Sequence, residues 1–155
     1  MQPLPASQLP SLAKSLKISY LNQIQTQVYH SIVDTDENVF IGAAEGSGKF
    51  TLALFAMLYA LNEGKKVVLI EPMEELCKSK FHMISKLFGQ YKVGKTFNEL
   101  AKDNQVLMVN DIIVSTPEAW EVISRRWRAR KGFEKIGLFV VDGVHMLSED
   151  NGVTL

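Results

Sequence analysis

The chain has 155 residues, 46% of them apolar and 22% charged, with 17 basic and 17 acidic side chains. This length and composition indicate one ordinary globular domain, and a net charge of zero gives no global sign of nucleic-acid binding. The single cysteine, Cys77, excludes an internal disulfide, and no apolar run reaches the ~20 residues that span a bilayer. We therefore expect an intracellular protein with no membrane partner.

In chain order, the hydrophobic pattern alternates between helical and strand periods. After a proline-punctuated lead-in over residues 1–20, we expect the domain to occupy residues 21–155. Helices are predicted at 22–34, 49–62, 74–89, 97–109 and 117–131, and strands at 38–42, 66–71, 92–97, 111–115 and 137–141. This alternation indicates an α/β fold with a parallel sheet and helices on both faces. Because the sequence ends soon after the last strand, we expect the sheet to be truncated at its C-terminal end.

Residues 43–49, "AAEGSGK", follow a predicted strand and open a predicted helix, which is the setting of a phosphate-binding loop. Gly46 and Gly48 let backbone N–H groups turn inward around Ser47, and Lys49 is long enough to reach the outer phosphates. The positive end of the following helix favours the same anion. We predict nucleotide binding by these four residues, with a purely structural glycine turn as the alternative.

The residues beside this loop argue against ordinary hydrolysis. The position after Lys49 normally carries a Ser or Thr hydroxyl that binds Mg²⁺, and Phe50 has none. Thr51 is no simple substitute, since one step along a helix rotates a side chain by about 100°. Glu45 adds negative charge at the mouth of the loop, unless its side chain turns into solvent. We expect ATP or ADP to bind weakly and Mg²⁺ not to bind in the normal way.

The second half of a nucleotide site is predicted after the last strand. That strand ends in Asp142, which would hold Mg²⁺ directly or through water in a phosphate-loop ATPase. The next position normally carries the glutamate that deprotonates the attacking water, and here it is Gly143. General-base catalysis typically contributes about 10²–10⁴-fold. With Phe50 and Gly143 in these places no catalytic residue is intact, and we predict that the site has stopped hydrolysing.

Several strings resemble the first RecA-like domain of a superkiller-type superfamily 2 RNA helicase. They are "LNQIQTQVYHSIVDTDENVFIGAAEGSGK", "EPMEEL", "IIVSTPEAWEVISRRWRARK" and "LFVVDGVHMLSEDNG". The resemblance covers residues 21–152 and is greatest to the C-terminal cassette of two-cassette spliceosomal members, which act on paired U4 and U6 snRNAs. In this family that cassette is a weakly active or inactive regulatory module. The resemblance implies a nuclear role in pre-mRNA splicing, with the other domains of the same helicase and spliceosomal proteins as partners.

The resemblance also assigns roles to residues outside the glycine loop. Gln25 matches the glutamine that reads adenine, although Gln23 replaces the proline that normally stands two residues before it. Asp142 and His145 match the second helicase motif, in which the histidine couples the nucleotide and RNA sites. Gly143 departs from that motif, so adenine recognition is implied while Mg²⁺-dependent hydrolysis is not.

Two strings carry implied RNA contacts. In "STPE", Thr116 and Pro117 resemble the segment that presents a helix N-terminus to an RNA phosphate, with a plain helix cap as the alternative. In "EPMEEL", Pro72 matches another strand-contacting motif, but Glu71 and two further glutamates place negative charge where a phosphate backbone would lie. We therefore expect any RNA contact to be weak.

The string "SRRWRARK" at residues 124–131 is the most basic part of the sequence. It places Arg125, Arg126 and Arg128 around Trp127. Arginine with tryptophan is typical of protein-interface anchors and of RNA contacts. The alternative is a solvated basic helix face.

These features support three functions. The first is a catalytically degenerate RecA-like domain that serves as a regulatory and protein-interaction platform within a splicing helicase. The second is an active ATP-dependent RNA helicase domain, in which Thr51 or water completes the metal shell and another carboxylate acts as base. The third is a structural module that binds nucleotide without hydrolysing it, so that the ligand only stabilises the fold.

Overall fold

The computed structural model describes residues 12–125, 127–129 and 131–144, and its contacts divide the chain into two parts, Met1–Asn62 and Glu63–Leu155. The expected boundary between residues 20 and 21 stays a prediction. Within the described residues, no helix has the length and apolar character needed to cross a membrane.

The N-terminal part holds the helices α1 (Leu12–Ser15), α2 (Gln23–Val33) and α3 (Lys49–Asn62). The helices predicted at 22–34 and 49–62 are therefore confirmed. The rings of Tyr29 in α2 and Phe55 in α3 meet edge to face, with centroids 5.8 Å apart, and both side chains are buried. The short helix α1 was not predicted from the sequence.

The strand predicted at 38–42 is wrong. This segment has no strand hydrogen bonds to any other described segment, and Val39 and Phe40 are 41% and 79% exposed. The prediction relied on a continuous apolar run, which is typical of a strand covered on both faces. A strand also needs a neighbour for its backbone groups, and an apolar run does not specify one.

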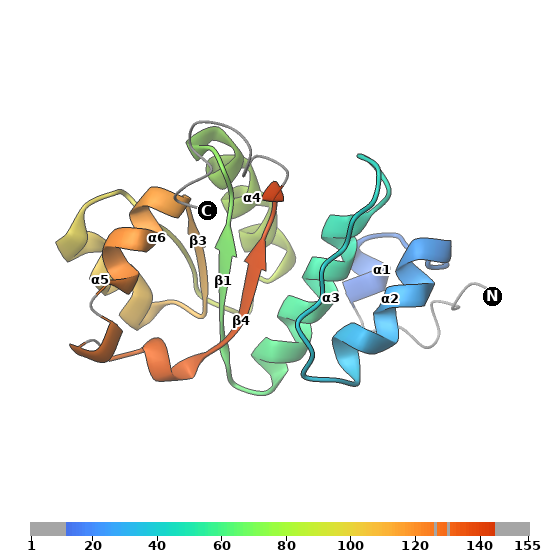
Figure 1. The fold of residues 1–155 in the computed structure, drawn as a ribbon, viewed down its shortest axis with the longest axis horizontal. Coiled ribbons are helices and arrows are strands. Elements are labelled where there is room, and N and C mark those ends of the chain that lie inside the picture. The colour runs from blue at the N-terminus through green and yellow to red at the C-terminus, as the bar shows by residue number, and fades with distance from the viewer. Residues whose placement is uncertain (1–11, 126, 130, 145–155) are drawn as a thin grey trace. The chain divides into compact units, whose positions relative to one another are not determined.

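The C-terminal part is built on a four-stranded parallel sheet in the order β2-β3-β1-β4 (Figure 1). Its strands are β1 (Lys66–Ile70), β2 (Val93–Lys95), β3 (Ile112–Ser115) and β4 (Ile136–Val141). The central strands β1 and β3 are buried along their whole length. The predicted parallel sheet is confirmed, and each of its four strands overlaps a predicted strand.

The connecting helices cover both faces of this sheet. They are α4 (Glu74–Leu87), α5 (Leu100–Val109) and α6 (Pro117–Ser124). The chain moves outward to β2 through α4 and returns toward β4 through α5 and α6. Because such crossovers are right-handed, α4 lies on one face while α5 and α6 lie on the other, as Figure 1 shows.

A hydrophobic core lies between the sheet and the pair α5 and α6. It joins Val68, Ile70 and Ile113 of the sheet to Leu107 of α5 and Ile123 of α6. All five side chains are less than 5% exposed. This packing fixes the C-terminal ends of the strands, where parallel sheets place their functional groups.

A buried lysine connects the sheet to the end of α5. The ammonium of Lys66 donates to the carbonyl oxygens of Leu107, Met108 and Asn110 at 2.8, 3.1 and 2.6 Å. Burial lowers the pKa of Lys66, mainly by desolvation. The last carbonyls of a helix have no partner within it, and a cation there also complements the helix dipole.

Two predicted helices have different limits in the structure. The helix expected from residue 97 begins at Leu100, because the buried Asp103 carboxylate accepts the N–H groups of Phe97 and Glu99 at 2.7 and 3.0 Å. The helix expected to reach residue 131 ends at Ser124 and is followed by the 3₁₀ turns Trp127–Ala129 and Phe133–Lys135. Between Ile123 and residue 131 the only large apolar side chain is that of Trp127, and it is 55% exposed.

Candidate functional site

The glycine loop turns through two positive φ angles and encloses the Lys49 ammonium. Gly46 and Gly48 have φ values of 75° and 83°, which L side chains rarely adopt. The Lys49 ammonium lies within the loop and donates to the carbonyl oxygens of Ala43 and Ala44 at 2.5 and 2.9 Å. Reaching an outer phosphate would exchange these hydrogen bonds for charge-assisted ones.

The N-terminal end of α2 holds this loop in place. Gln25 Nε2 donates to the Gly48 carbonyl at 3.1 Å, and Asn22 Nδ2 donates to the Ser47 carbonyl at 2.8 Å. Asn22 and Gln25 also form the capping box of α2. Gly48 has a positive φ, and a Cβ on it would lie 2.3 Å from Gln25 Nε2, so a side chain here would strain the backbone and displace the Gln25 amide.

Gln25 is therefore used within the protein. It is 6% exposed, and its Oε1 accepts the backbone N–H of Asn22 at 3.0 Å. Its implied contact with adenine stays a prediction. The role of Asn22 was missed, although the spacing Asn-x-x-Gln before a helix is a capping-box signal that could have revealed it.

The groups in the loop fit an anion but not a metal ion. Ser47 Oγ is buried without a hydrogen-bond partner, and a Cβ on Gly46 would meet nothing within 4 Å. An unpartnered hydroxyl beside open space suits a phosphate oxygen. Phe50 offers no oxygen for Mg²⁺, and Glu45 is exposed, as expected if its carboxylate turns into solvent.

A cluster of charges lies at the C-terminal ends of β1 and β4. The backbone N–H of Asp142 donates to the Ile70 carbonyl at 3.0 Å, which continues the pairing of the two strands. From α4, the Lys80 ammonium donates to Asp142 Oδ2 at 3.2 Å and forms an ion pair with Glu71 Oε1 at 3.4 Å. One cation therefore serves two carboxylates, and one of them is the predicted metal ligand.

Glu71 is the most buried member of this cluster. It is 1% exposed, and burial raises its pKa to about 7, although the charge of Lys80 acts in the opposite direction. Glu71 is therefore not at the surface but pairs with Lys80 of α4, and the expectation that this segment contacts RNA only weakly stays a prediction. Lys80 was also missed, although it follows the buried Cys77 by three residues, which is a helical spacing.

Gly143 has a backbone conformation that a glutamate would not adopt easily. Its φ is 77°, and a Cβ on it would lie 2.9 Å from Pro72 Cγ. Its N–H donates to Asp142 Oδ1 at 2.9 Å. A glutamate at position 143 would therefore need either a strained backbone or a different path of the main chain.

The residues predicted to contact RNA form a helix cap in the structure. Thr116 is the N-cap of α6, and its Oγ1 accepts the N–H of Ala119 at 3.4 Å. Pro117 is buried at the first helical position. This geometry agrees with the alternative of a plain cap, and contact with RNA stays a prediction.

The basic segment after α6 presents its tryptophan to solvent. Trp127 is 55% exposed, and the Arg128 guanidinium lies 5.2 Å from the centre of its ring. Arg125 forms a close ion pair with Glu121 one turn earlier. Arg126 and His145 lie outside the described residues, so their predicted roles stay predictions.

Comparison with known proteins places these features in a family. The DEAD/DEAH box helicase model matches residues 22–154. The chain is 42% identical over 164 residues to the U5 small nuclear ribonucleoprotein 200 kDa helicase of Mus musculus, covering 100% of this chain and 8% of that protein. It is 36% identical over 163 residues to activating signal cointegrator 1 complex subunit 3 of Danio rerio, covering 100% of this chain and 11% of that protein.

The fold has a counterpart among solved structures. A hypothetical ATP-dependent RNA helicase from Sulfolobus tokodaii superposes with a TM-score of 0.68 at 18% identity, covering 92% of this chain and 42% of that chain. The predicted RecA-like fold is therefore confirmed, as is the resemblance to a superfamily 2 helicase. By its sequence and its fold, the chain belongs to the DEAD/DEAH box helicase family.

Proposed function

We propose that this chain is the RecA-like domain of a catalytically degenerate cassette in a pre-mRNA-splicing RNA helicase, where it acts as a regulatory and protein-interaction platform. The observation that carries the proposal is the pairing of Asp142 with the Lys80 ammonium at 3.2 Å. The carboxylate that a helicase would use for Mg²⁺ already has a cation from its own chain.

Replacing that cation by a metal ion would be costly. Mg²⁺ demands near-ideal octahedral geometry and gives up its waters reluctantly. Displacing Lys80 would also leave the buried Glu71 beside Asp142 without its positive partner, and like charges in a poorly solvated site repel. Phe50 supplies no compensating ligand from the loop. Both the loop, through Phe50, and the charge cluster around Asp142 therefore support the proposal.

Nucleotide binding is proposed to be weak and independent of Mg²⁺. The loop keeps its inward-turning glycines, the Ser47 hydroxyl and Lys49, so a phosphate group of ATP or ADP fits its chemistry. When bound, such an anion would stabilise the N-terminal part by mass action. The platform role needs no turnover.

The name of one relative and an exposed pair of side chains support the partners that we propose. The name of one relative assigns it to the U5 small nuclear ribonucleoprotein, which supports a nuclear, spliceosomal setting for this chain. The exposed Trp127, stacked with Arg128, has the composition of an interface anchor. We propose that this pair contacts either another domain of the same helicase or a spliceosomal protein.

Titration calorimetry of ATP into the 155-residue chain, with and without Mg²⁺, tests the proposal. We expect a Kd no tighter than about 1 mM that does not change with Mg²⁺. The variant Lys49→Ala is the matched control, because it removes the loop cation and leaves the cluster around Asp142 intact. Micromolar binding strengthened by Mg²⁺ would overturn the proposal.

An active helicase domain is the second candidate, and one observation favours it. Glu71 is a second carboxylate at the same end of the sheet as Asp142, and its pKa of about 7 suits a general base. ATP turnover by the complete cassette, abolished in a Glu71→Gln variant, would support this candidate. Turnover that is absent from the wild-type cassette would exclude it.

A further inference from the structure

At one edge of the sheet in the C-terminal part, no strand among the described residues pairs with the outer side of β2. Strand β2 is the last in the order β2-β3-β1-β4. The Lys92 carbonyl accepts the N–H of Ile112, and the Thr96 N–H donates to the Val114 carbonyl, so even-numbered groups of this strand face β3. Because backbone groups alternate along a strand, the N–H and C=O of Val93 and Lys95 point to the open edge.

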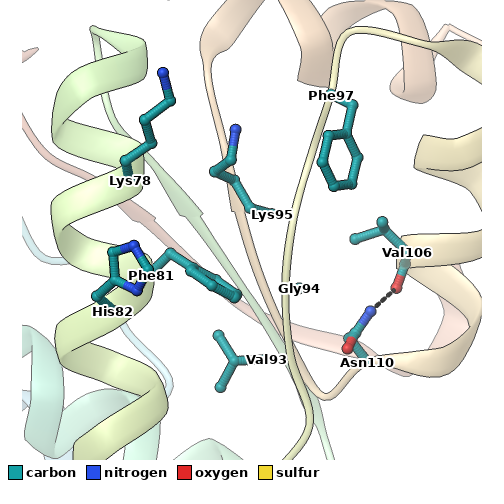
Figure 2. Close-up of a pocket in the computed structure, with 9 residues that line it drawn as sticks. All are labelled: Lys78, Phe81, His82, Val93, Gly94, Lys95, Phe97, Val106 and Asn110. Carbon is teal, nitrogen blue, oxygen red and sulfur yellow. Dashed lines mark hydrogen bonds between the residues drawn. The ribbon is translucent and has the colours of Figure 1, made fainter.

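A groove of about 410 Å³ runs along this edge. Figure 2 shows its two sides, with Lys78, Phe81 and His82 of α4 on one and Phe97, Val106 and Asn110 on the other. The strand itself forms the floor between them. A Cβ on Gly94 would lie 2.4 Å from Asn110 Nδ2 and 2.8 Å from Val106 Cγ1, so this glycine lets the second side approach closely.

The two sides of the groove differ in charge. On the α4 side, the ammonium groups of Lys78 and Lys95 lie 3.2 and 3.5 Å from the same oxygen, Glu74 Oε1. Lys95 also donates to the Thr96 carbonyl at 3.3 Å, and its ammonium lies 5.3 Å from the centre of the Phe97 ring. Two cations that share one carboxylate leave one positive charge in excess. The other side presents the Phe97 ring and the Val106 side chain.

We propose that this groove binds an extended acidic peptide that adds to β2 as a further strand. The open N–H and C=O groups of Val93 and Lys95 pair with the peptide backbone. Side chains of a strand alternate between its two faces, so acidic residues at every second position meet Lys78 and Lys95. The intervening apolar residues meet Phe97 and Val106. This proposal rests on the proposed function of the chain as an interaction platform. It adds a second interaction surface, besides Trp127 and Arg128, and states the chemistry of the partner that would bind there.

The groove fits a peptide better than RNA. Its floor offers backbone donors and acceptors at strand spacing, which a nucleic-acid backbone does not match. A phosphate backbone also needs a row of cations along its length. Among the described residues, the ion pairs of Lys78 and Lys95 both go to Glu74 Oε1, so this part of the groove holds two cations rather than a row of them.

Fluorescence anisotropy with the full 155-residue chain tests the proposal. The probe is a labelled ten-residue peptide in which Glu alternates with Val, compared with the same peptide carrying Lys for Glu and with a labelled single-stranded RNA of similar length. Raising the salt from ~0.1 to ~1 M shortens the screening length from about 10 to about 3 Å and should weaken the acidic peptide's binding.

Variants separate backbone pairing from charge. Val93→Pro removes an N–H that points away from β3, so it should weaken peptide binding about fivefold or more without breaking the ladder. Val93→Ala is its control, because it shortens the side chain and keeps the N–H. Lys95→Glu should weaken binding by about fivefold or more, whereas Lys86→Glu, at an exposed site of α4 outside the groove, should have no effect.

Each outcome of these experiments either supports or overturns the addition of an acidic peptide strand to β2. Binding of the acidic peptide that is lost with Val93→Pro and Lys95→Glu, together with slower exchange of the Val93 and Lys95 amide protons, supports strand addition. No binding of the acidic peptide, equal binding to Val93→Pro and Val93→Ala, or RNA binding that depends on Lys95 overturns it. None of these experiments contains nucleotide, so failure here is distinct from failure of the calorimetric test of the degenerate site.

Discussion

The glycine loop and the charge cluster around Asp142 hold the residues that the sequence predicted for the phosphate and the metal ion of a nucleotide site, and the two regions differ in what they keep. The loop retains positive φ values at Gly46 and Gly48 and an unpartnered Ser47 hydroxyl, all of which suit an anion. In the cluster, Lys80 holds Asp142, and Gly143 follows a path that crowds out a side chain. If the loop binds an anion as proposed, these differences imply that it does so without the metal chemistry of the cluster.

The largest expected effect comes from removing the cation of the cluster. Lys80→Met leaves Glu71 and Asp142 without their shared partner, and breaking such a pair should lower the free energy of unfolding by about 3 kcal/mol at pH 8. Urea denaturation measures the change. Lys86→Met, at an exposed position of the same helix, should stay within about 0.5 kcal/mol, and equal effects of the two variants would contradict the role of the cluster.

The same cluster predicts a pH dependence. The pKa of Glu71 rises from 4.5 to about 7 on folding, so between these values the folded chain keeps a proton that the unfolded chain has released. The contribution of Glu71 to the free energy of unfolding therefore falls as the pH rises through this window, by an amount on the order of 3 kcal/mol, and is constant above it. Denaturation of the wild type and of Glu71→Gln at pH 5 and pH 8 measures the difference, and parallel profiles would refute it.

The loop offers a sharper steric comparison. Gly48→Ala combines a positive φ with a clash against Gln25, whereas Gly46→Ala has the same kind of φ and open space around it. We expect losses of stability of about 3 and about 1 kcal/mol, respectively. Thermal unfolding followed by circular dichroism distinguishes them, and equal losses would show that the Gln25 contact is unimportant.

The smallest expected effect is on metal dependence. Phe50→Thr restores the hydroxyl of the loop, but Asp142 stays paired with Lys80, so Mg²⁺ should strengthen ATP binding to this variant by less than about tenfold. Calorimetry with and without Mg²⁺ provides the measurement. A larger gain would mean that the loop alone controls the metal, and the two halves would no longer differ as described.

Much of this could be predicted from local sequence. Apolar runs located the strands of the sheet, helical spacing located α2, α3 and α4, and the glycine loop was recognisable from its residues alone. The helix limits at Leu100 and Ser124 were missed because they depend on the Asp103 carboxylate and on how little of Trp127 the fold buries. The strand predicted at 38–42 was wrong because an apolar run does not specify which segment would pair with it.

The sequence by itself determined the family, the parallel sheet and the absence of the hydroxyl and the glutamate at Phe50 and Gly143. Only the tertiary structure decided that Lys80 pairs with Asp142, 62 residues away, that Glu71 is buried beside them, and that no described strand pairs with the outer edge of β2. Periodicity and turn chemistry act over a few neighbouring residues, so they can be read along the chain. Ion pairs and free edges depend on which distant segments meet, and that is settled only when the sheet and its helices pack together.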